Sequence, residues 1–77
     1  MELRVIVHEE QGTYWSEIAE LPGCFASAGS LAELHDALGE SVGLYLWDAP
    51  VQLPDQELML GESMIEVAPP AGLVPGP

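Results

Sequence analysis

Two histidines, one cysteine and thirteen carboxylates are the side chains through which this 77-residue chain could do chemistry. His8 precedes two glutamates and His35 precedes Asp36, so a metal or acid–base role has to be weighed for each. Adjacent residues of a helix do not face each other, and His35 and Asp36 therefore do not form a catalytic pair. We interpret His8 as a histidine at the rim of a turn and His35 as a solvated helix residue.

Cys24 is the single cysteine. A nucleophilic cysteine needs cationic surroundings that lower its pKa, and the chain offers one arginine and no lysine. One cysteine also excludes an intrachain disulfide and a zinc site built from several sulfur ligands of one chain. We therefore expect Cys24 to be a packed, inert thiol.

The carboxylates do not follow the pattern of a catalytic site. A two-metal nuclease needs several carboxylates that converge from neighbouring elements, whereas Glu17 and Glu20 flank a Leu-Pro-Gly turn and other acids fall on a predicted helix and loop. The sequence contains no glycine-rich phosphate loop and no metal-ligand spacing. We predict a protein that is not an enzyme, with no catalytic residues, no metal site and no cofactor.

The charge balance limits the possible partners. Thirteen acidic residues stand against Arg4 alone, for a formal net charge of −12, which argues against direct binding of nucleic acid or of an anionic membrane. The 48% of hydrophobic residues argue against a disordered acidic tail. Two interpretations stay open, a basic partner or charge that serves solubility alone. The first residues lack a basic segment and a long apolar run, so we expect a cytoplasmic protein without a signal peptide or membrane span.

Alternating residues predict three strands, at 3–8, 13–19 and 24–28. In the first, Leu3, Val5 and Val7 face one way and the residues between them face the other. Gly12 and the Leu-Pro-Gly turn provide tight connections, so the three strands should form an antiparallel meander.

A helix should follow at about 31–47. Ser30 and Glu33 have the spacing of a capping box, and Pro50 disfavours helix shortly after residue 47. The helix carries an apolar stripe: Leu31, Leu34, Leu38, Val42 and Tyr45. Residues 48–62 read as a loop, and 63–67 as a fourth strand that the helical crossing would let join the sheet in parallel.

Gly39 and Gly43 lie one turn apart on this helix, away from the apolar stripe. Each costs about 1 kcal/mol relative to alanine in a helix interior. Two interpretations stay open, a smooth groove that another backbone approaches or a weak helix held by its leucines.

The predicted fold is thus an α+β domain over residues 1–68, in the order β-β-β-α-β, followed by a flexible tail rich in proline and glycine at 69–77. One helix covers one face of the sheet and leaves the other open. We expect self-association through the open face, as a dimer or tetramer, with Ile6, Tyr14 and Trp15 as interface candidates.

Residues 14–24, Tyr-Trp-Ser-Glu-Ile-Ala-Glu-Leu-Pro-Gly-Cys, together with the capped helix after them, resemble the HicB-like antitoxin family. The match is tightest at Glu20, Leu21, Pro22, Gly23 and Cys24, and the likeness spans about residues 2–48 and 63–67. It implies a partial ribonuclease H-like fold without that enzyme's catalytic carboxylates. It also implies an oligomeric protein that binds and blocks a small basic RNA-cleaving toxin.

Many members of that family carry a C-terminal DNA-binding module, whereas after Val67 this chain has only a short segment rich in proline. We therefore expect no binding of operator DNA. The partner-binding candidates, chosen by position, are Glu9, Glu10, Glu17 and Glu20. The alternative function is a stand-alone oligomeric binding or regulatory module without a toxin.

Overall fold

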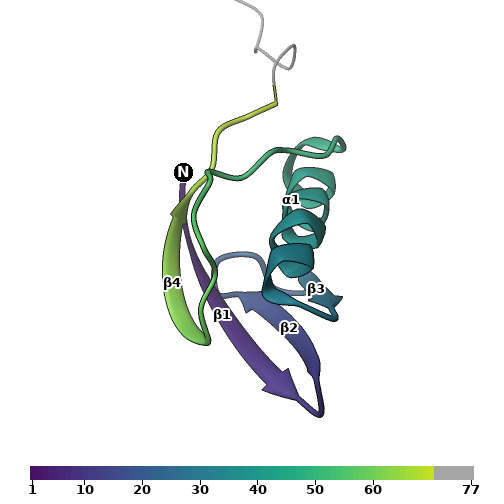
Figure 1. Cartoon of the computed structure of the whole chain (residues 1–77). Coiled ribbons are helices and arrows are strands. Elements are labelled where there is room, and N and C mark those ends of the chain that lie inside the picture. Colours follow the sequence, from purple (N-terminus) through teal and green to yellow (C-terminus); the bar gives the residue numbers. More distant parts are fainter. Residues whose placement is uncertain (71–77) are drawn as a thin grey trace, which may run out of the picture.

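The computed structural model describes residues 1–70 and contains four strands and one helix in the order β-β-β-α-β (Figure 1). These elements are β1 (Glu2–Glu10), β2 (Thr13–Ile18), β3 (Phe25–Ala28), α1 (Leu31–Trp47) and β4 (Gly61–Glu66). The predicted α+β class and element order are confirmed. The tail predicted at 69–77 falls, from residue 71 on, outside the described residues.

The four strands form one sheet in the order β3-β2-β1-β4, in which every neighbouring pair is antiparallel. The predicted meander is confirmed. The parallel fourth strand is wrong, because β4 pairs antiparallel with β1, with Leu3 opposite Ile65.

The direction of β4 follows from the path of the chain after the helix. Segment 49–54 turns back along α1, with the amide of Ala49 donating to the carbonyl of Gly43 at 3.3 Å and that of Val51 donating to Gly39 at 3.2 Å. The chain thereby returns toward the start of the helix before β4 begins, and β4 enters the sheet from the opposite end (Figure 1).

The two helix glycines permit this return. A Cβ atom on Gly39 would overlap the carbonyl of Val51, and one on Gly43 would overlap the backbone of residues 49–51. Both glycines are buried. The groove interpretation of these glycines is therefore correct, and the backbone that fills the groove is the chain's own.

The core lies between α1 and one face of the sheet. Leu34 and Leu38 of the helix are fully buried, as their spacing predicts, and share one core cluster with Val5 of β1. Leu53 and Leu58, from the segment after the helix, complete the core. The helix begins where the capping box predicts, since the Ser30 hydroxyl accepts a hydrogen bond from the amide of Glu33 at 3.1 Å.

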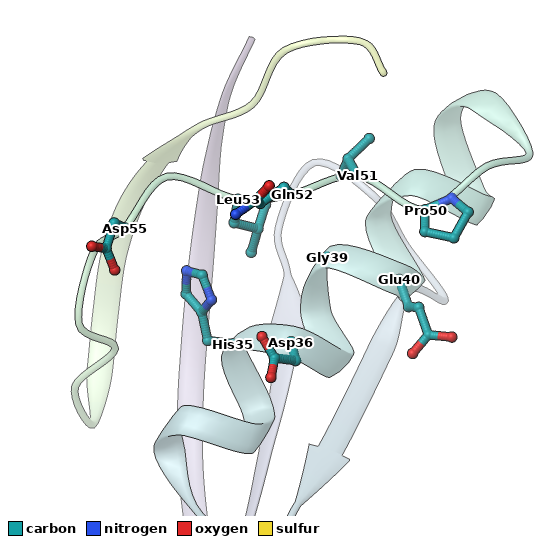
Figure 2. A pocket seen from close by; sticks show the side chains of 9 residues that line it. All are labelled: His35, Asp36, Gly39, Glu40, Pro50, Val51, Gln52, Leu53 and Asp55. Atoms are coloured by element: carbon teal, nitrogen blue, oxygen red, sulfur yellow. The ribbon is translucent and has the colours of Figure 1, made fainter. Parts of the chain in front are cut away.

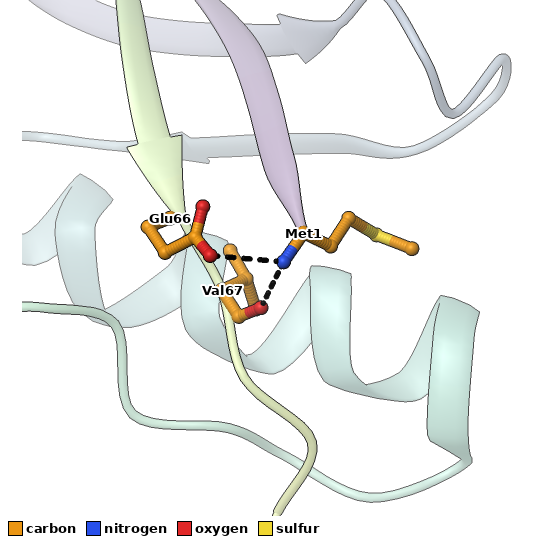
Figure 3. Close-up of polar contacts among 3 residues, drawn as sticks. All are labelled: Met1, Glu66 and Val67. Carbon is orange, nitrogen blue, oxygen red and sulfur yellow. Dashed lines mark hydrogen bonds and ion pairs between the residues drawn. The ribbon is translucent and has the colours of Figure 1, made fainter.

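Residue 1 is tied to the strand next to it. The Met1 amino group lies 3.2 Å from a carboxylate oxygen of Glu66 and donates to the carbonyl of Val67 at 3.1 Å, while the Val67 amide donates back to the Met1 carbonyl (Figure 3). β1 and β4 are thus held together at this end of the sheet. No helix within residues 1–70 has the length and apolarity needed to cross a membrane.

Candidate functional site

The Glu-Leu-Pro-Gly-Cys motif forms the corner between β2 and β3. Gly23 has a φ of +87°, which glycine adopts without strain, and the Cys24 amide closes the turn by donating to the Leu21 carbonyl at 3.0 Å. Glu20 accepts a hydrogen bond from the Arg4 amide at 2.7 Å, and the Pro22 carbonyl accepts one from the Tyr45 hydroxyl at 3.0 Å. The motif therefore connects β2 and β3 and ties this corner to β1 and to the helix.

Cys24 is 4% exposed, and burial raises the pKa of its thiol. Desolvation disfavours the charged thiolate, which is the nucleophilic form. The prediction of a packed thiol is confirmed.

The sheet face away from the helix is not covered by α1, and we call it the open face. By strand alternation and burial, β1 contributes Arg4, Ile6 and His8 to it, while Leu3, Val5 and Val7 are buried on the other side. The other strands contribute these residues to it: Trp15, Glu17, Phe25, Ser27, Glu62 and Met64. Phe25 is 59% exposed and Met64 46% exposed, so this face carries uncovered apolar surface.

His8 lies within the open face and not at the rim of a turn, which corrects the sequence interpretation. β1 continues to Glu10, so His8 pairs with Trp15 across the sheet. The two rings stack with centroids 4.1 Å apart and planes inclined by 19°. His8 Nε2 lies 3.5 Å from a carboxylate oxygen of Glu17, and it has no hydrogen-bond partner among residues 1–70.

The structure separates the three interface candidates. Ile6 and Trp15 lie on the open face, whereas Tyr14 packs against the core on the helix side. Placing Tyr14 on the open face is wrong because consecutive strand residues point to opposite sides of a sheet. Self-association itself stays a prediction.

The four partner-binding candidates are also divided. Glu9 accepts a hydrogen bond from the Gly12 amide at 2.9 Å, and Glu20 accepts one from Arg4, so both stabilise the local backbone. Glu10 is exposed at the end of β1. Glu17 is half-buried within the open face, in contact with His8.

His35 is partly exposed, so the predicted solvated position describes only part of its surroundings. Its Nε2 lies 2.8 Å from the carbonyl oxygen of Pro54, so the ring connects α1 to the segment after it. The sequence around His35 could not predict this contact, because Pro54 is 19 residues away along the chain.

A shallow groove of about 690 Å³ lies between α1 and the segment that follows it (Figure 2). Its charged lining consists of Asp36, Glu40 and Asp55, and His35 lines it between Asp36 and Asp55. Across residues 1–70, no three histidine, cysteine or acidic side chains lie close enough together to hold a metal ion.

The carboxylates are spread over the whole surface. Of the thirteen, Glu17 is half-buried and the others are exposed. Within the described part of the chain, three of them lie within 4.0 Å of a basic group, namely Glu17, Glu62 and Glu66. Most of the carboxylates are thus exposed and lie farther than 4.0 Å from a basic group within residues 1–70.

Fold and surface together define a small acidic α+β domain with one helix on one face of a four-stranded antiparallel sheet. Over 63 residues the chain is 36% identical to a UPF0150 protein of Archaeoglobus fulgidus. The aligned residues make up 82% of this chain and 88% of that protein. The chain belongs to the UPF0150 family. No protein-family model and no solved structure matches it.

Proposed function

We propose that this chain is a HicB-like antitoxin-type protein of the cytoplasm, which binds a small basic RNA-cleaving toxin and inhibits it without being an enzyme itself. The observation that carries the proposal is the excess of surface carboxylates without a basic neighbour in residues 1–70. Such a surface attracts a protein whose own RNA-binding face is rich in lysine and arginine.

Two further observations support the proposal. Membership of the UPF0150 family agrees with the resemblance of residues 14–24 to HicB-like antitoxins. Residues 20–24 form a corner whose Glu20 and Pro22 are hydrogen-bonded within the fold. We therefore expect the toxin to bind to the surface around this corner.

The test is functional pairing with a neighbouring gene product. The small basic protein encoded beside this chain should arrest growth when expressed alone, and co-expression of this chain should restore growth. In vitro, the chain should block RNA cleavage by that protein, and higher salt should slow their association because charge steers it. The absence of such a neighbour, or growth arrest that persists on co-expression, would overturn the proposal.

A second candidate function is a stand-alone oligomeric binding or regulatory module. The uncovered apolar side chains of the open face favour it, since such patches commonly mark interaction sites. Light scattering at low and high salt tests this candidate. An oligomer that salt strengthens supports it, because salt screens the repulsion between copies, and a monomer under both conditions contradicts it.

A further inference from the structure

The open face carries carboxylates at its centre. Ile6 of β1 lies between Glu62 of β4 and Glu17 of β2, and Glu17 pairs in turn with Phe25 of β3. One row across the sheet therefore reads acid, apolar, acid, aromatic. Any surface that covers Ile6 also covers the two carboxylates beside it.

Few basic groups of the open face lie near the row formed by Glu62, Ile6, Glu17 and Phe25. Arg4 Nε lies 3.9 Å from Glu62, with both side chains more than half exposed, and His8 lies 3.5 Å from Glu17. Strand alternation adds three further carboxylates to this face, from Glu2, Glu10 and Glu66. The Met1 amino group contacts Glu66 and leaves the central row unchanged.

This arrangement disfavours a second copy as the occupant. Two open faces packed together would remove their central carboxylates from water and place like charges opposite each other, both of which cost free energy. A basic surface would instead give each carboxylate a lysine or arginine while covering the apolar residues between them.

We propose that the open face, centred on Glu62, Ile6, Glu17 and Phe25, is the docking surface for the basic RNA-cleaving protein. This inference rests on the proposed function and assigns its surface. The partner places lysine or arginine side chains on Glu17 and Glu62 and an apolar side chain over Ile6.

A hollow at the β3 edge extends this surface. It has a volume of about 460 Å³ and continues from Trp15 and Phe25 round the edge of the sheet to Ser41 and Leu44 of α1. Phe25 and Leu44 are 59% and 52% exposed. A second apolar side chain of the partner fits this hollow, with Glu40 at its border.

Calorimetric titration of full-length variants tests the surface. The probe is the small basic protein encoded beside this chain, in a catalytically inactive form. Glu17→Gln with Glu62→Gln should raise Kd by about 30-fold, because two central charge pairs are lost. The control, Glu33→Gln with Glu57→Gln, removes the same charge from exposed positions outside the open face and should raise Kd less than about threefold.

Each result decides the matter. Equal weakening by the two double variants overturns the surface and leaves the proposed function standing, whereas no binding by the wild-type chain overturns both. A stable wild-type dimer in light scattering that Ile6→Glu converts into a folded monomer would place a second copy on this face and also overturn the proposal.

Discussion

On its helix side, β1 contributes Leu3, Val5 and Val7, each at most 3% exposed, whereas the alternate residues Arg4, Ile6 and His8 face away from the helix. The covered side is almost wholly apolar, so it yields the free energy of folding through burial. The open face mixes acidic, basic and aromatic side chains. Burial of its charged groups without partners would cost free energy and would not stabilise the fold. One strand thus stabilises the fold on one side and carries the proposed docking surface on the other.

The largest expected difference between the two faces is at neighbouring residues of β4. Ile65 is 1% exposed on the covered side, and Met64 is 46% exposed on the open face. Ile65→Ala should lower the free energy of unfolding by about 3 kcal/mol, because it removes buried methyl groups and leaves a cavity. Met64→Ala should lower it by less than about 1 kcal/mol. Urea denaturation measures both, and equal losses would contradict the distinction between the faces.

Helix glycines should be the next most sensitive positions. Gly43→Ala places a Cβ against the backbone of residues 49–51, so it should destabilise the fold by about 2 kcal/mol despite the better helix propensity of alanine. Gly29→Ala is the control, since no backbone atom lies within 4 Å of a Cβ there. Thermal unfolding compares the two variants. A Gly43→Ala variant as stable as the wild type would show that segment 49–51 does not pack closely on α1.

Ser16 should be a weak point of the covered side. Its side chain is fully buried, and its hydroxyl has no hydrogen-bond partner among residues 1–70. Ser16→Ala should raise the free energy of unfolding by about 1 kcal/mol, because an unsatisfied buried hydroxyl is removed. Ser27→Ala, at an exposed position of β3, should change it by less than about 0.5 kcal/mol. A destabilised Ser16→Ala variant in urea denaturation would show that the hydroxyl has a partner.

The smallest effect concerns Cys24 at alkaline pH. Burial raises the pKa of this thiol, so the folded state keeps its proton more firmly than the unfolded state. The stability that the protonated Cys24 thiol contributes should be complete below the ordinary thiol pKa of about 8.5. It should disappear as pH rises through the higher pKa that this thiol has in the folded state. Cys24→Ala should show a shallower alkaline loss of stability than the wild type, measured by denaturation between neutral and alkaline pH. Parallel losses would exclude this linkage.

Much of the fold could be predicted from local pattern. The helix at 31–47 and its Ser30 cap follow from spacing that depends on neighbouring residues alone. The division of β1 between two faces follows from alternation. The direction of β4 could not be predicted, because it depends on where the chain travels between Asp48 and Gly61.

The candidate site was predicted less completely. The sequence identified Ile6, Trp15 and Glu17 as surface candidates, but it also named Tyr14, which lies on the opposite side of the sheet from Trp15. It did not bring Glu62 beside Ile6 or His8 onto Trp15, because those neighbours come from separate strands and their register is a tertiary property.

By itself, the sequence determined an acidic α+β chain with a capped helix, a tight turn at residues 21–23 and a sheet with one uncovered face, because charge, capping and periodicity are local properties. The tertiary structure alone decided that segment 49–54 returns along the helix glycines, that β4 runs antiparallel to β1, and that Glu17 and Glu62 flank Ile6. Those arrangements depend on which distant backbones can approach each other, and close packing settles that only when the whole chain has folded.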